Sequence, residues 1–216
     1  MRPHRSDRGA ALITALMITS LLGALAASLV FVVVTESRVG RNQQAAESGA
    51  YAAAAGVERL IGELRRLPSW QMVPSSSSAA GAFNDGRPVP SLADGTPLDL
   101  TRLTADRQAA SDAFYPNGPN RPVWGLYAHA SLARITSSDP RMALPYVVVW
   151  VADDADEADG DPSRDSNGVI LVRAEAFGTR GGRRAIEATL AASVVRDPAG
   201  LPVLSSVAVV AVREAR

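Results

Sequence analysis

The densest group of residues that could do chemistry is an acidic segment at residues 151–169, which reads VADDADEADGDPSRDSNGV. Its carboxylates are opposed by a single cation, Arg164, so like charges repel unless water, salt or a bound cation compensates. Calcium takes about six to eight oxygen ligands, which acidic, amide and hydroxyl side chains supply at alternating loop positions. Such alternation occurs at Asp159, Asp161, Ser163, Asp165 and Asn167.

Two interpretations of this acidic segment stay open. Arg164 stands where a calcium-binding loop has glycine, and Ile170 stands where it has a closing glutamate. The partial match allows a solvated hairpin loop that holds no metal. It equally allows a Ca²⁺ site made by the five alternating residues.

The residue types that the chain lacks exclude several kinds of chemistry. The chain has no cysteine and no lysine, which excludes disulfides, thiolate-bound metals and Schiff-base catalysis. His129 has no acid or nucleophile beside it in the sequence, so we expect a structural or surface histidine. We expect Trp70, Trp124 and Trp150 in the core. The formal net charge is zero, which gives no sign of a nucleic-acid-binding protein, and we expect no enzymatic activity.

The elements that would carry these residues begin with an uncharged run at residues 10–34. About 20 apolar residues in a helix cross a bilayer core, so the run predicts a membrane-spanning helix. It is longer than the apolar core of a secretory signal peptide. Arg2, Arg5 and Arg8 precede it, which predicts a cytoplasmic N-terminus and an exported remainder.

The next segment, residues 35–67, keeps a helical period but is apolar on one side only. Apolar residues recur at three- and four-residue spacing from Ala46 onward, whereas Glu58 and Glu63 lie off this stripe. Pro68 should end the helix. We therefore expect the second half of the helix to pack one face against a globular partner.

The rest of the chain divides into an irregular connection and a strand-rich domain. Residues 68–122 are rich in proline, serine and glycine, with a short helix predicted over 100–114. Long loops are usually functional or disordered, and both interpretations stay open for residues 74–98. Strand patterns then occur at 123–136, 145–151, 168–177, 183–195 and 202–212.

The alternation within residues 183–195 indicates how the sheet is buried. Ile186 and Leu190 alternate with Glu187 and Thr189, a pattern typical of one buried and one solvated face. We therefore expect an α+β fold in which the long helix packs on a C-terminal antiparallel sheet over residues 123–216.

The N-terminal residues resemble those of type IV prepilins. A short basic leader that ends in Gly9 runs directly into an uncharged helix that starts at Ala10, like a prepilin processing site. Residues 35–42 (TESRVGRN) and 50–58 (AYAAAAGVE) resemble two sequence blocks of PilX-like minor pilins. The resemblance covers roughly residues 5–66.

The resemblance implies a processed N-terminus. A prepilin peptidase would cut between Gly9 and Ala10, and the new amine of Ala10 would be methylated. Major pilins usually have glutamate at the fifth mature position, where this chain has Thr14. The same absence is familiar in subunits at a fibre tip, which have no subunit above to pair with. The implied divisions are a leader at 1–9, a transmembrane or fibre-core helix at 10–34, an amphipathic continuation at 35–67, a connection at 68–122 and a sheet domain at 123–216.

The resemblance also implies a function. A minor pilin primes or caps a type IV pilus and bridges to other minor pilins or to a tip adhesin. Before assembly it lies in the bacterial inner membrane with its C-terminal domain in the periplasm, and afterwards in the pilus at the cell surface. Two alternatives stay open: a K-type pseudopilin of a type II secretion system, and a bitopic envelope module that binds calcium or another ligand without joining a fibre.

Overall fold

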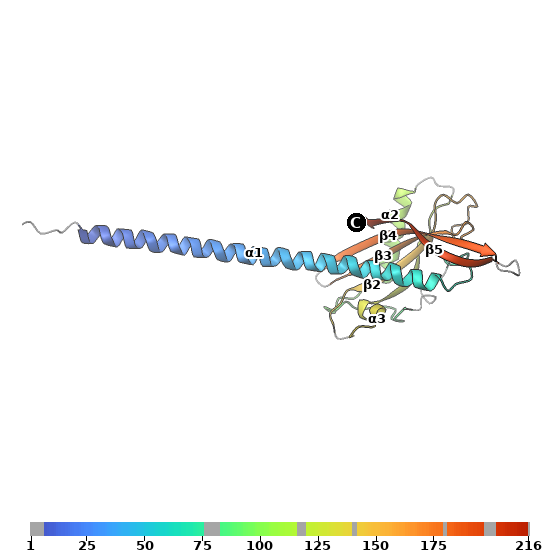
Figure 1. Ribbon diagram of the computed structural model, residues 1–216, viewed down its shortest axis with the longest axis horizontal. Coiled ribbons are helices and arrows are strands. Elements are labelled where there is room, and N and C mark those ends of the chain that lie inside the picture. Colours follow the sequence, from blue (N-terminus) through green and yellow to red (C-terminus); the bar gives the residue numbers. More distant parts are fainter. Residues whose placement is uncertain are drawn as a thin grey trace, which may run out of the picture. The chain divides into compact units, whose positions relative to one another are not determined.

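The computed structural model describes residues 7–75, 83–115, 120–139, 142–178, 181–196 and 202–215 (Figure 1). The chain divides into two compact units, residues 1–44 and 45–216, and the boundary falls inside the first helix. The elements in chain order are α1 (Asp7–Leu64), α2 (Leu100–Phe114), β1 (Gly125–Ser131), α3 (Leu132–Thr136), β2 (Tyr146–Asp153), β3 (Val169–Phe177), β4 (Arg183–Arg196) and β5 (Pro202–Ala215).

In the first unit, α1 exposes apolar side chains along the whole uncharged run. Leu12, Leu22 and Phe31 are more than half exposed, and the helix is long and apolar enough to cross a membrane. The hydroxyls of Thr14 and Thr19 donate to the carbonyls of Ala10 (2.9 Å) and Ala15 (2.7 Å). These bonds satisfy the hydroxyls within the helix, as hydrocarbon surroundings require.

In the second unit, α1 packs through one stripe, as its period predicts. The stripe consists of small and branched residues that face the sheet: Ala52, Ala53, Val57, Leu60, Ile61 and Leu64. Gly56 allows the closest approach, because a Cβ atom there would lie 2.7 Å from Val147 Cγ1. Glu63, expected on the polar face, is instead buried beside Tyr127, which hydrogen-bonds to it. The α-helix ends at Leu64, and tighter turns continue to the residue before Pro68.

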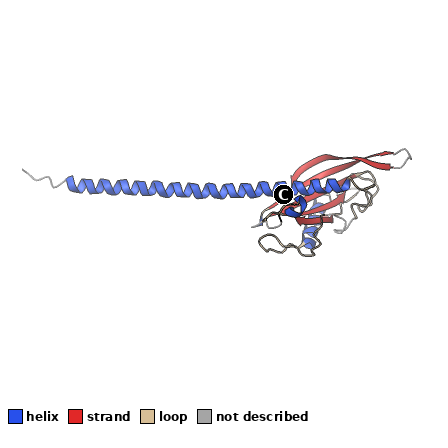
Figure 2. Ribbon diagram, turned by 60° about the horizontal axis from the view of Figure 1, so that its bottom comes forward, coloured by secondary structure: helices blue, strands red, loops and turns tan. Residues whose placement is uncertain are grey.

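The strands form an antiparallel meander in the order β1-β2-β3-β4-β5 (Figure 2). The register aligns Val149 with Ala174 and Val172 with Ala188. These residues lie on the face that α1 covers, together with Val147, Val151 and Ile170. Together with the stripe of α1 and other apolar residues, they make up the larger of the hydrophobic clusters in the described residues.

The expectation of a single buried face is wrong. All eight residues of β2 are buried, because α2 and the chain before it cover the second face. Trp150, Tyr146 and Phe177 pack there against Leu98 and Leu100. The residues of β2 indicate burial on both sides, since an apolar run without alternation is typical of a strand covered on both faces.

Two further expectations are corrected or refined. The strand predicted over 123–136 ends at Ser131, whose side chain accepts from the backbone N–H of Arg134 and caps the short helix α3. Within residues 74–98, the described part from residue 83 is ordered: Phe83 and Leu98 are buried. Residues 76–82 lie outside the described part of the chain. The helix predicted over 100–114 is confirmed as α2, with Asp99 as its N-cap.

Candidate functional sites

The acidic segment forms the loop between β2 and β3. Asp153 ends β2, pairs in register with Ile170 and is fully buried. Asp154, Glu157 and Asp165 are also buried. Burying carboxylates without cations is costly, and the loop's own cation, Arg164, is engaged elsewhere: the Gln71 side-chain oxygen, in the amide orientation that satisfies both groups, accepts from Arg164 Nε at 2.8 Å.

Three carboxylates of the loop, two of them buried and one exposed, converge. Asp153, Glu157 and Asp159 each place an oxygen within 4.8 Å of the other two. Asp153 Oδ1 and Glu157 Oε2 are buried without a hydrogen-bond partner. The other oxygen of Asp153 accepts from Asn120 Nδ2 at 2.6 Å, and the Asn120 carbonyl oxygen is itself buried and unpartnered.

The pKa values of this group reflect burial among like charges. Burial raises the pKa of Asp153 to about 6, and the charges of Asp154 and Asp165 add to the effect against the hydrogen bond from Asn120. Burial, followed by the charges of Asp153 and Asp159, raises the pKa of Glu157 to about 7. The folded loop therefore favours a positive partner, either a proton or a cation.

The residues chosen from alternation alone lie differently. Asp159 is exposed and belongs to the converging group, whereas Asp161, which is also exposed, accepts from Ser163 Oγ at 2.5 Å. Asp165 Oδ1 accepts from the backbone N–H groups of Gly168 (2.7 Å) and Val169 (3.2 Å). Asn167 Nδ2 donates to Asp154 at 2.9 Å. These four side chains hold the turns of the loop, and calcium binding through the five alternating residues stays a prediction.

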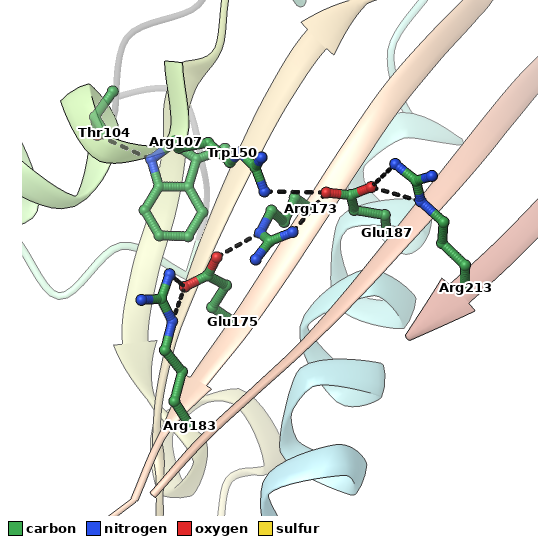
Figure 3. Close-up of polar contacts among 8 residues, drawn as sticks. All are labelled: Thr104, Arg107, Trp150, Arg173, Glu175, Arg183, Glu187 and Arg213. Carbon is green, nitrogen blue, oxygen red and sulfur yellow. Dashed lines mark hydrogen bonds and ion pairs between the residues drawn. The ribbon is translucent and has the colours of Figure 1, made fainter. Parts of the chain in front are cut away.

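A second polar cluster lies on the sheet face beneath α2 (Figure 3). Glu187 on β4 accepts from Arg107 of α2 (3.1 Å), Arg173 of β3 (2.5 Å) and Arg213 of β5 (2.7 Å). Glu175, which is 1% exposed, accepts from Arg173 and Arg183.

These contacts join α2 to three strands. Burial acts to raise the pKa of Glu187, but the hydrogen bonds from Arg213 and Arg173 outweigh it and hold that pKa below its ordinary value. Trp150 Nε1 adds a hydrogen bond of 2.9 Å to Thr104 Oγ1 of α2. This cluster was not predicted from the sequence, in which the alternation of β4 suggested a solvated face for Glu187. The signal in the sequence is the charged pair Arg173 and Glu175 inside an otherwise apolar strand.

A cavity of about 330 Å³ borders this cluster, between α2 and the strands. Its lining includes Arg107, Ser111 and Trp124. Each of these residues has a buried side-chain atom without a hydrogen-bond partner: Arg107 Nε, Ser111 Oγ and Trp124 Nε1. Buried polar groups commonly bond to ordered water, which a cavity of this size accommodates.

His129 lies in the interior, as expected of a structural histidine. Its Nδ1 lies 2.8 Å from the Tyr146 hydroxyl, which in turn donates to Asp85 Oδ2 at 2.8 Å. Because the Tyr146 proton is used on Asp85, Nδ1 is the donor in the first contact. Burial lowers the pKa of His129, against the charge of Asp85. Trp70, Trp124 and Trp150 are buried, as predicted.

Comparison of the chain with protein-family models, curated proteins and solved structures found no match.

Proposed function

We propose that the chain is a minor pilin subunit that primes assembly of a type IV pilus, or caps it, and bridges to other minor pilins or a tip adhesin. In this proposal a prepilin peptidase removes residues 1–9 and Ala10 is methylated. Before assembly the subunit lies in the inner membrane with its sheet domain in the periplasm. During assembly it moves into the fibre at the cell surface.

One observation carries the proposal: α1 is a single helix with two kinds of surface. Residues 10–34 are apolar on all sides and exposed, and such a surface is compatible both with lipid and with packing against identical helices. From Ala52 to Leu64 the same helix is buried on one stripe against an antiparallel sheet. A protein that only anchors a domain to the membrane does not need one helix that is apolar on all sides in its first part and packed against a sheet in its second part.

The presence of Thr14 in place of glutamate favours a position of this subunit at the end of a fibre. Its hydroxyl donates to the Ala10 carbonyl, within its own helix. The side chain therefore offers no charge to the N-terminal amine of a neighbouring subunit, which is the role of glutamate in the pilins that this chain resembles. A subunit that begins or caps the fibre does not need that pairing.

The alternatives predict different partners for the same chain. A K-type pseudopilin would be required for secretion of exoproteins and would bind other pseudopilins. A bitopic envelope module would stay in the membrane fraction with residues 1–9 attached. Cross-linking through the helix in source cells, followed by identification of the linked subunits, separates the pilus from the secretion assignment.

The proposal is tested with Gly9→Leu in the full chain. A bulky side chain before the cleavage point should block processing, so the variant should accumulate in the membrane fraction and disappear from the sheared surface-fibre fraction. Gly62→Ala is the matched control, because a Cβ atom at Gly62 meets nothing within 4 Å and lies far from the cleavage point in the sequence. Fibre incorporation of Gly9→Leu at the level of Gly62→Ala would overturn the proposal.

A further inference from the structure

We infer that Asp153, Glu157 and Asp159 form a calcium-binding site at the base of the β2–β3 loop, and that the amide of Asn120 holds Asp153 in place. This ligand set differs from the alternating positions of the loop and shares only Asp159 with them. The inference does not depend on the pilin proposal, because it concerns an equilibrium of the isolated chain.

The geometry matches an ion held by several oxygens. Calcium–oxygen distances are about 2.3–2.6 Å, so two oxygens on one Ca²⁺ ion lie at most about 5 Å apart. The converging oxygens of the three carboxylates satisfy this limit, since all lie within 4.8 Å of one another. Among the described residues, this is the group of acidic or histidine side chains that meets such a criterion.

The hydrogen bonds of the group give an independent reason. Asp153 is fully buried, Glu157 is 5% exposed, and each has a buried oxygen without a partner. The Asn120 side chain is 1% exposed, and its oxygen is also unpartnered while its amide nitrogen binds Asp153. Buried oxygens are normally satisfied, and a cation satisfies several at once.

The charges favour a divalent cation. Asp154 and Asp165 lie close enough to raise the pKa of Asp153, so the site is surrounded by further carboxylates. Arg164 is held by Gln71. Hard oxygen ligands on an irregular loop suit Ca²⁺, which tolerates variable geometry, better than Mg²⁺, which demands a near-ideal octahedron.

The test uses the full chain purified in detergent. We expect CaCl₂ to bind in a calorimetric titration and to raise the melting temperature, and we expect a chelator to reverse the shift. Glu157→Gln and Asp159→Ala should weaken calcium binding about tenfold or more, because each removes a charged ligand. Both variants should melt cooperatively in chelator, which shows that they are folded.

Asp161→Ala is the matched control, since Asp161 lies on the same loop, is exposed and falls outside the converging group. It should bind calcium as the unmodified chain does. Absence of calcium binding by the unmodified chain would overturn the inference. A loss in Asp161→Ala equal to that in Asp159→Ala would also overturn it, because the ligands would then follow the alternating positions of the loop. Binding that persists in both Glu157→Gln and Asp159→Ala would place the ion elsewhere.

Discussion

The two faces of the sheet are filled by different means. On the face that α1 covers, alanine, valine and glycine bring a helix close to the strands, and Gly56 lies directly over Val147. On the face that α2 covers, apolar residues fill the β1–β2 side. Arginine and glutamate fill the β3–β5 side, where Glu187 binds three arginines.

The difference indicates what each face depends on. Close packing leaves little room for extra atoms, so the α1 face should be sensitive to volume. The long side chains of the α2 face fill space by reaching across it, and their charges are compensated only as a set. The β3–β5 side of that face should therefore be sensitive to the loss of a charge rather than to a small change in volume.

The largest effect is expected from Gly56→Leu. Its Cβ atom alone would lie 2.7 Å from Val147 Cγ1 and 3.3 Å from Val149 Cγ2. Overpacking costs about 1–3 kcal/mol, and because two valines are in the way we expect a loss at the upper end of that range in the free energy of unfolding, measured by chemical denaturation in detergent. Gly62→Ala, which meets no neighbour, should instead stabilise by about 0.5–1 kcal/mol. Similar stability for the two variants would show that α1 does not pack closely at Gly56.

A somewhat smaller loss is expected from Glu187→Gln. The substitution keeps the shape but leaves Arg107, Arg173 and Arg213 without the carboxylate that they share. Removing one partner of a buried ion pair lowers the free energy of unfolding by about 3–5 kcal/mol. Because Arg213 is partly exposed, we expect a smaller loss of about 2–3 kcal/mol.

The control for Glu187→Gln is Asp106→Asn, which breaks the exposed pair with Arg102. It should change the free energy of unfolding by less than about 0.5 kcal/mol. Equal effects of Glu187→Gln and Asp106→Asn would mean that the arginine cluster contributes no more than a surface ion pair, and the contrast between the two faces would fail.

A third, smaller effect depends on pH. Burial lowers the pKa of His129, so the unfolded state binds this proton more readily than the folded state. The contribution of neutral His129 to the free energy of unfolding is complete above the ordinary histidine pKa of about 6.5. It decreases as the pH drops toward the lower pKa that His129 has in the folded state. Raised pKa values at Asp153 and Glu157 act in the opposite direction, but they do so equally in a His129→Gln variant.

The measurement for His129 is therefore a difference. Denaturation midpoints of the unmodified chain and His129→Gln are compared between about pH 7 and pH 5. Relative to the variant, the unmodified chain should lose stability on acidification. A parallel pH dependence of the two proteins would mean that His129 keeps its ordinary affinity for protons in the fold.

The sequence was informative where local patterns decide the structure. The period of residues 46–64 predicted the buried stripe of α1, and a short helix was expected over residues 100–114, where α2 lies. Strand patterns predicted β2 to β5, although Ser131 caps a helix where a longer β1 was expected.

The candidate sites depend on contacts between distant residues, which spacing does not reveal. Asn120 and Asp153 lie 33 positions apart, and Arg107 and Glu187 lie 80 apart. Within the acidic loop, alternation suggested ligands, but backbone N–H groups bind Asp165. Only the structure shows that Asp153, the last residue of β2, lies in the interior beside Glu157.

We propose that the apolar part of α1 begins as a membrane helix and, after its leader is removed, becomes part of a fibre. The most direct measurement is the intact mass of the chain isolated from surface fibres of source cells. We predict a mass of residues 10–216 plus one methyl group. A mass that retains residues 1–9, or a chain cut at another position, would contradict it.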